Sequence, residues 1–252
     1  MLKTRIIPVL LLKNRGLYKG IKFKNHTYVG DPINTVRIFN EKEVDELILL
    51  DIEASLKNKP IDFTYLEEVV SEAFMPIGYG GGIDSVETAK KLFSIGIEKI
   101  ILNTNAFLNP NLISELAKNF GSQSIVVSVD VKKSFFGASV YIKSGTIKIG
   151  LDPLEACILA EKSGAGEVII NDIDKDGTRS GYNLDYVKGI AKNLKIPVIV
   201  CGGAKSIEDF IEAKKAGAHA CAAGAMFVYH GPHRAVLISY PKYDDLRKVL
   251  GE

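Results

Sequence analysis

The sequence predicts a (β/α)8 TIM barrel built from two repeated half-barrels, with residues 1–252 forming one domain. Short runs rich in Val, Ile and Leu alternate with longer amphipathic segments about eight times. Landmarks also recur 121 residues apart: Leu50-Asp51-Ile52 as Asn171-Asp172-Ile173, and Gly81-Gly82-Ile83 as Gly202-Gly203-Ala204. The length of 252 residues suits this fold, and a repeat near half that length indicates one unit used twice. A doubly wound sheet alternates similarly but seldom gives eight regular units with half-chain repetition.

The strand candidates are nearly continuous in apolar residues, as expected for parallel strands covered on both faces. We expect them at 5–11, 46–52, 76–80, 99–103, 124–130, 167–172, 197–201 and 219–224.

The amphipathic segments between these runs predict helices, and four of them carry start signals. The signals are Asp84 with Glu87, Asn109-Pro110, Asp152-Pro153, and Ser206 with Asp209. The predicted helices are 32–44, 62–73, 84–95, 110–119, 152–163, 183–193, 206–216 and 241–250.

Two segments interrupt the alternation. Residues 13–31 are too long for an ordinary connection between a strand and a helix, and long loops on a rigid barrel are usually functional lids. Residues 228–241 contain Gly231, Pro232 and Pro241 where a final helix would begin. The second segment is either a surface for a partner or an irregular terminus.

Composition excludes several classes of function. A net charge of +2 gives no electrostatic case for nucleic acid, and no apolar run is long enough to span a membrane, so a cytoplasmic protein is expected. The cysteines lack paired spacing, and Cys201 and Cys221 lie in apolar runs as buried thiols would. His230 and His233 lack a thiol or carboxylate partner nearby. We therefore expect no metal and no cofactor.

Polar residues and glycines follow the predicted strands, at the barrel end where active sites form. Gly80-Gly81-Gly82 and Gly202-Gly203 stand at matching places in the two halves, before helices, where backbone N–H groups approach anions closely. Asn103-Thr104 and Gly224 follow neighbouring strands. This pairing favours a substrate with a phosphate at each end.

The motifs together resemble the cyclase subunit (HisF) of imidazole glycerol phosphate synthase, from residue 1 to about residue 227. The similar segments are Arg5-Ile6-Ile7-Pro8, Gly30-Asp31-Pro32, Leu50-Asp51-Ile52, Gly80-Gly81-Gly82-Ile83, Asn103-Thr104, Gly121-Ser122-Gln123, and 174–182, Asp-Lys-Asp-Gly-Thr-Arg-Ser-Gly-Tyr.

The resemblance implies a set of roles. In that family two aspartates, after the first and fifth strands, act as acid and base in cyclisation; Asp130 matches the second, and Leu11 occupies the place of the first. The other implied substrate- and phosphate-binding residues are Lys19, Asp51, Gly81, Gly82, Asn103, Thr104, Asp176, Gly177, Gly202, Gly203 and Gly224. The family's ring of charges around the ammonia entrance matches Arg5, Glu46, Lys99 and Glu167.

Departures from the family accompany Leu11. Ala225 follows Gly224 where the family usually has serine, and Asn171-Asp172 replaces Thr-Ser. Residues 230–241 resemble a divergent branch found with surface-polysaccharide genes. There a HisF-like and a HisH-like protein are thought to supply ammonia to a sugar amidotransferase.

Three hypotheses follow. The first is a HisF-like subunit that pairs with a HisH-type glutaminase and passes ammonia for amidination of a sugar, with a sugar amidotransferase as a further partner and a phosphorylated small molecule as ligand. The second is an ordinary cyclase (a lyase) of histidine biosynthesis. The third is a scaffold that passes nothing and has no need of the charged ring.

Overall fold

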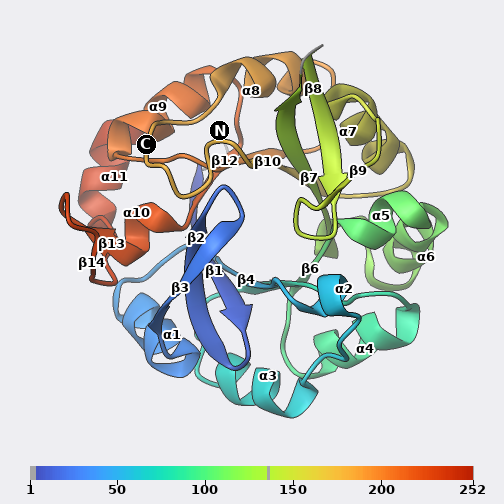
Figure 1. Cartoon of the computed structure of the whole chain (residues 1–252), viewed down its shortest axis with the longest axis horizontal. Helices are drawn as coiled ribbons and strands as arrows, with labels where there is room; N and C mark the ends of the chain where they lie inside the picture. Colours follow the sequence, from blue (N-terminus) through green and yellow to red (C-terminus); the bar gives the residue numbers. More distant parts are fainter. Residues whose placement is uncertain (1–3, 135–136, 252) are drawn as a thin grey trace.

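The computed structural model describes residues 4–134 and 137–251. Within them, parallel strands follow one another around a closed circuit, because each pairs with the next and β7 pairs with β10. Helices surround this barrel (Figure 1). The barrel strands are β1 (Arg5–Lys13), β4 (Leu47–Asp51), β5 (Ile77–Gly80), β6 (Lys99–Leu102), β7 (Ile125–Ser134), β10 (Glu167–Asp172), β11 (Val198–Cys201) and β12 (Ala220–Ala223). The predicted (β/α)8 barrel and its strands are confirmed.

The helices cover the outside of the strands. They are α1 (Pro32–Glu41), α2 (Ala54–Lys57), α3 (Phe63–Val70), α4 (Val86–Ser94), α5 (Thr104–Leu108), α6 (Asn111–Phe120), α7 (Pro153–Lys162), α8 (Leu184–Ala191), α9 (Ile207–Lys215), α10 (Ala225–Val228) and α11 (Tyr243–Leu250); η1 (Ser122–Ser124) is a short 3-10 turn. All eight predicted helices are present. The four-residue α2 and α10 and the five-residue α5 were not predicted, because so few residues show no helical periodicity.

The start signals are confirmed in part. Asp152 caps α7 by accepting from the N–H groups of Leu154 and Glu155, and Ser206 and Asp209 form a capping box on α9. The signal at Asp84 was wrong by one residue, because the Ser85 hydroxyl accepts from the Thr88 N–H. Pro110, which has no side-chain donor or acceptor, precedes α6.

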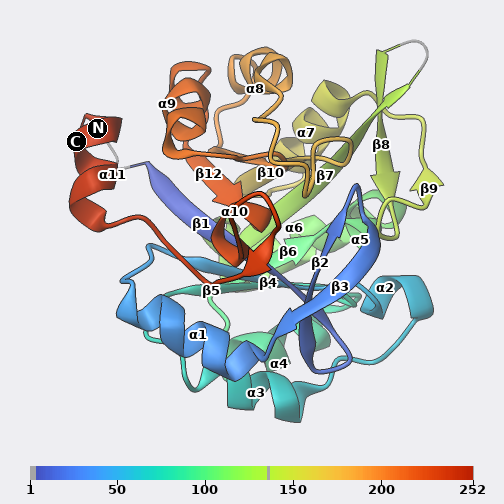
Figure 2. The same cartoon turned by 60° about the vertical axis from the view of Figure 1, so that its left-hand side comes forward.

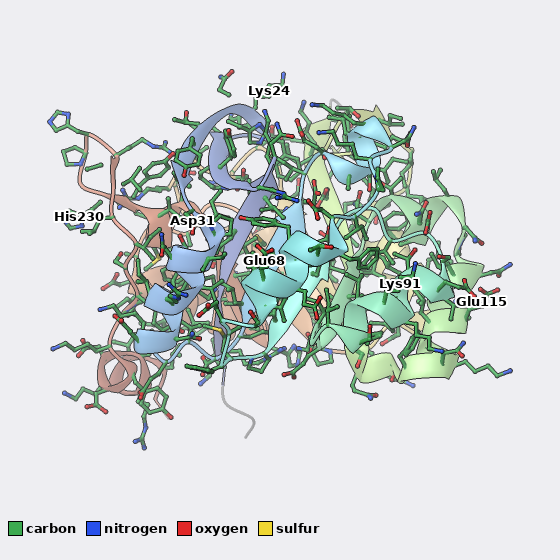
Figure 3. The ribbon with its side chains drawn as sticks, turned by 90° about the horizontal axis from the view of Figure 1, so that it is seen from below. Lys24, Asp31, Glu68, Lys91, Glu115 and His230 are labelled. Carbon is green, nitrogen blue, oxygen red and sulfur yellow. The ribbon has the colours of Figure 1, made fainter. Side chains whose placement is uncertain are left out.

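Residues 13–31 are not the irregular loop that we expected. They form an antiparallel hairpin of β2 (Gly16–Ile21) and β3 (Lys24–Gly30), with β2 paired to the end of β1. Figure 2 shows this hairpin at the end of the barrel away from the two termini, and Lys24 lies at its tip (Figure 3). A second hairpin continues β7 into β8 (Gly137–Ile142) and β9 (Ile147–Lys148).

Residues 229–240 form a strap along the outside of the barrel. The strap begins with the short antiparallel pair β13 (Tyr229–His230) and β14 (Ala235–Val236) and continues as an extended stretch. At its first end, Arg179 donates to the Gly231 carbonyl at 3.4 Å, and His230 lies at the edge of the molecule (Figure 3). At the other end, the Tyr240 hydroxyl donates to the Ile6 carbonyl at 2.9 Å, and its ring packs 5.2 Å from that of Phe227.

Replacing Tyr240 by phenylalanine should lower the free energy of unfolding by about 1 kcal/mol. The ring contact would remain while the carbonyl of the buried Ile6 lost this donor, and a net hydrogen bond is worth about that much. Urea unfolding of the two proteins measures the difference. Equal midpoints and slopes would mean that this hydrogen bond does not hold the strap.

Candidate functional site

A cavity of about 310 Å3 opens at the carboxyl ends of the barrel strands, under the two hairpins. It brings together nine of the residues singled out from the sequence: Lys19, Asp51, Gly81, Gly82, Asn103, Thr104, Asp130, Asp176 and Gly224. Because parallel strands end at the same face, residues far apart in sequence converge here. We call this cavity the mouth.

Asp130 lies in β7 and is 7% exposed in the mouth. Its Oδ1 accepts from the Ser128 hydroxyl at 3.0 Å and from the Asn171 amide at 3.4 Å. Burial raises the pKa of Asp130 to about 7, although these two donors oppose the rise. A carboxyl with this pKa exchanges a proton readily near neutral pH, which is the property that acid–base catalysis needs.

Leu11 lies in β1, and its half-buried side chain lines the same mouth. Leu11 pairs with Leu50 on β4, just as Asp130 pairs with Asn171 on β10. Leu50 and Asn171 are 121 residues apart, the spacing of the repeat. One half-barrel therefore places an apolar pair where the other places a carboxyl and an amide.

Lys19 reaches the mouth from the hairpin strand β2. Its ammonium donates to Asp176 Oδ1 at 2.6 Å, and both side chains are almost fully buried. The Lys22 N–H donates to the Asp176 carbonyl at 2.9 Å, which ties the hairpin to the loop after β10. The charge of Lys19 is thus neutralised within the protein.

Sequence reasoning missed His26, which enters the mouth from β3. Burial, together with the positive charges of Lys19 and Lys13, lowers the pKa of His26. It also missed Ser128 and Cys201 as mouth residues. Their positions near strand ends were the one signal in the sequence that could have identified these residues. The apolar neighbours of Ser128 and Cys201 made both look like core residues.

The first-half residues of the expected phosphate site are held in place by hydrogen bonds to neighbouring residues. Asn103 donates its amide to the carbonyls of Ser128 and Tyr141, and the Thr104 hydroxyl accepts from the Lys143 N–H at 3.1 Å. The Gly82 N–H donates to the Ser55 hydroxyl at 3.3 Å.

A matching pair of backbone contacts supports the internal repeat. At Gly81 a Cβ would lie 2.5 Å from the Asp51 carbonyl oxygen, and at Gly202 a Cβ would lie 2.6 Å from that of Asp172. Both glycines have positive φ, 122° and 91°. Only glycine fits such a close approach in that conformation. Asp51 and Asp172 also play equivalent parts, since each Oδ1 accepts from backbone N–H groups that follow it.

The second-half glycines line a separate, smaller cavity beside the mouth. Gly177, Gly202 and Gly203 meet there with Asp176, Arg179 and Gly224, around a volume of about 10 Å3. That volume is close to the space of one water molecule.

The four charged residues of the ring lie at the opposite end of the barrel, where the strands begin. Arg5 donates to Glu46 at 2.5 Å and to Glu167 at 2.8 Å, while Lys99 donates to the same two carboxylates at 3.0 and 3.1 Å. Burial opposes the charge of Arg5, yet the two carboxylates raise its pKa. Each ion has two partners of opposite sign, so the ring is closed and balanced.

Other kinds of site find no support in the part of the chain that the structure describes. No three His, Cys, Asp or Glu side chains gather as metal ligands within residues 4–134 and 137–251. Over the same ranges, no helix is long and apolar enough to cross a bilayer. Cys157, Cys201 and Cys221 are buried free thiols.

The fold and the mouth define a (β/α)8 barrel with a buried carboxyl, that of Asp130, at the carboxyl ends of its strands. Residues 5–233 match the family described as Histidine biosynthesis protein. The chain belongs to this family and is HisF-like.

Three curated relatives show the range of similarity. The Pseudomonas aeruginosa protein named "Putative imidazole glycerol phosphate synthase subunit hisF2" is 52% identical over 98% of this chain and 99% of its own. A hisF3 protein of Vibrio vulnificus, with the corresponding name, is 44% identical over 99% and 97%. The HisF subunit of imidazole glycerol phosphate synthase from Alkaliphilus metalliredigens is 37% identical over 91% and 92%.

Proposed function

We propose that this chain is the HisF-like subunit of a glutamine amidotransferase system. It pairs with a HisH-type glutaminase as a heterodimer and passes ammonia through the barrel for amidination of a sugar in surface-polysaccharide synthesis. The observation that carries the proposal is the contrast between the two ends of the barrel. The charged ring is complete at one end, while Leu11 faces the mouth at the other, where a cyclase of this family has an aspartate.

The inside of the barrel supports passage of a small neutral molecule. Between the ring and the mouth, the inward-facing cluster consists of Ile7, Val9, Ile48, Ile101, Val126, Ile169, Ile199, Cys201, Ala220 and Ala222. An apolar lining suits neutral ammonia better than an ammonium ion, which would lose its hydration there without compensation. We assign the gating role on this path to the charged ring.

Leu11 argues against the cyclase reaction. A leucine neither donates nor accepts a proton, and losing one member of an acid–base pair commonly removes at least about 10²-fold in rate. Asp130, with a pKa of about 7, keeps one proton-transfer group in the mouth. One such group suffices for assisting attack by ammonia but leaves half of the cyclisation unassisted.

Two further features favour an acceptor outside histidine biosynthesis. The strap of residues 229–240 carries the segment that resembles the polysaccharide-linked branch. The numbered names hisF2 and hisF3 set two of the relatives apart from plainly named HisF subunits. The second candidate function is the cyclase of histidine biosynthesis, which the 37% identity to a HisF subunit favours and Leu11 opposes.

Replacing Leu11 by aspartate should restore little cyclase activity, less than about tenfold above the unmodified chain. Asn171 and Ala225 also differ from the cyclase pattern. The assay is turnover of the phosphoribulosyl-formimino aminoimidazole ribotide with saturating ammonium. Recovery to the rate of an ordinary HisF subunit would show that Leu11 alone sets the function.

A further inference from the structure

Two buried oxygens in the mouth have no hydrogen-bond partner among the described residues: Asn171 Oδ1 and Asp176 Oδ2. Both residues line the mouth, and each is 8% exposed. A buried acceptor without a donor is costly, so native structures nearly always satisfy it. Two of them in one cavity indicate a ligand that brings donors.

The hydrogen bonds that Asn171 and Asp176 make leave these two oxygens without partners. The Asn171 amide nitrogen donates to Asp130, which turns Oδ1 of the same amide away from that carboxyl and toward Gly202, where a Cβ would lie 3.3 Å from it. Lys19 donates to Asp176 Oδ1 and leaves Oδ2 without a partner. This wall of the mouth therefore presents acceptors and the carboxyl of Asp130.

Comparison of the two half-barrels shows that polar side chains occupy these strand positions in the second half alone. Leu50 stands where the repeat places Asn171, and Leu11 stands where it places Asp130. The barrel geometry does not require polar side chains at these positions, since the first half fills them with leucine. An amide at the Asn171 position with an unsatisfied oxygen points to a bound polar group rather than to packing.

We propose that Asn171 Oδ1 and Asp176 Oδ2 form a binding site for a nitrogen that carries at least two hydrogens, as in ammonia, ammonium or a primary amino group. This inference rests on the proposed function and deepens it. Asn171 and Asp176 line the mouth together with Asp130, and the Asn171 amide donates to that carboxyl, so a nitrogen bound at Asn171 is close to a proton-transfer group. An anion is disfavoured because the wall offers carboxylate and amide oxygens.

Methylammonium is the probe, because its methyl protons are visible in saturation-transfer NMR. The complete chain at pH 8 and constant ionic strength should bind methylammonium and should not bind tetramethylammonium, which has the charge but no N–H. Asn171→Leu, which copies the Leu50 position of the other half, should weaken methylammonium binding at least about tenfold, as expected for a lost hydrogen bond to a charged donor. Asn119→Leu changes an exposed residue of α6 and should leave the affinity for methylammonium unchanged.

Competition separates the two sources of the nitrogen. Displacement of methylammonium by ammonium indicates that the site holds the delivered ammonia, while binding without displacement indicates the amino group of an acceptor. Equal affinity of Asn171→Leu and the unmodified chain, equal binding of tetramethylammonium, or no binding of methylammonium would overturn the proposal.

A measurement on the unmodified chain guards against misfolding of the variant. Bound methylammonium should lower the pH at which the Asp130 carboxyl carbon titrates in 13C NMR, and no movement would also overturn the proposal. Neither readout needs a glutaminase or an acceptor. If methylammonium did not bind but the chain still coupled glutamine hydrolysis to amination, the nitrogen-binding site would be rejected and the proposed function would stand.

Discussion

Lys99→Ala should uncouple glutamine hydrolysis from amination. Lys99 holds both carboxylates of the ring, Glu46 at 3.0 Å and Glu167 at 3.1 Å, and its removal leaves them sharing Arg5 alone. Breaking a largely buried ion network commonly costs about 3–5 kcal/mol, and the partial exposure of Lys99 reduces that figure here. The rearranged ring should let ammonia escape to solvent.

The measurement uses glutamine labelled with 15N in its amide group and an excess of unlabelled ammonium in solution. With the glutaminase, this chain and the acceptor system present, product from the unmodified chain should carry mostly 15N. The Lys99→Ala product should carry severalfold less. Lys215→Ala removes an exposed lysine paired with Glu212 and serves as the matched control. Low 15N labelling already with the unmodified chain would support a scaffold that passes nothing, and undiminished labelling with Lys99→Ala would contradict a gating role for the ring.

Asp130→Asn should make the chain more stable at alkaline pH, with a difference of several kcal/mol at pH 8.5. Burial raises the pKa of Asp130 to about 7, far above the ordinary value of 3.8. Between these values the folded chain holds a proton that the unfolded chain has lost. The contribution of Asp130 to stability therefore falls as pH rises from about 4 to 7, by up to about 1.4 kcal/mol per pH unit.

Asparagine has no such proton, so the two proteins should be similar near pH 4.5 and diverge as the pH increases. Urea unfolding at a series of pH values measures the divergence. Asp185→Asn, at an exposed position of α8, should follow the unmodified chain throughout. A constant difference between Asp130→Asn and the unmodified chain across this range would mean that Asp130 is ionised at all these pH values.

Most of the barrel could be predicted because its strands are buried on both faces and its helices have one apolar side. Periodicity failed where an element is short or half-exposed. The hairpin of β2 and β3 carries lysines, glycines and an exposed Tyr28, so residues 13–31 lacked the alternation that marks a strand.

The site was predictable where chemistry shows in residue type and position. Asp130 and the paired glycines follow strands, and the mouth contains most of them. The orphaned oxygen of Asn171 was not predictable, because it depends on which way an amide turns inside a folded cavity. The sequence also gave no sign that Lys19 is neutralised by Asp176, 157 residues away.

The most direct test is turnover of the phosphoribulosyl-formimino aminoimidazole ribotide by the purified chain with saturating ammonium salt. Ammonium replaces the glutaminase, so the assay reports the chemistry of the barrel alone. Folded protein should give a rate at least about 10²-fold below that of an ordinary HisF subunit, because Leu11 transfers no proton. A rate in the ordinary range would contradict the account and make this chain a cyclase.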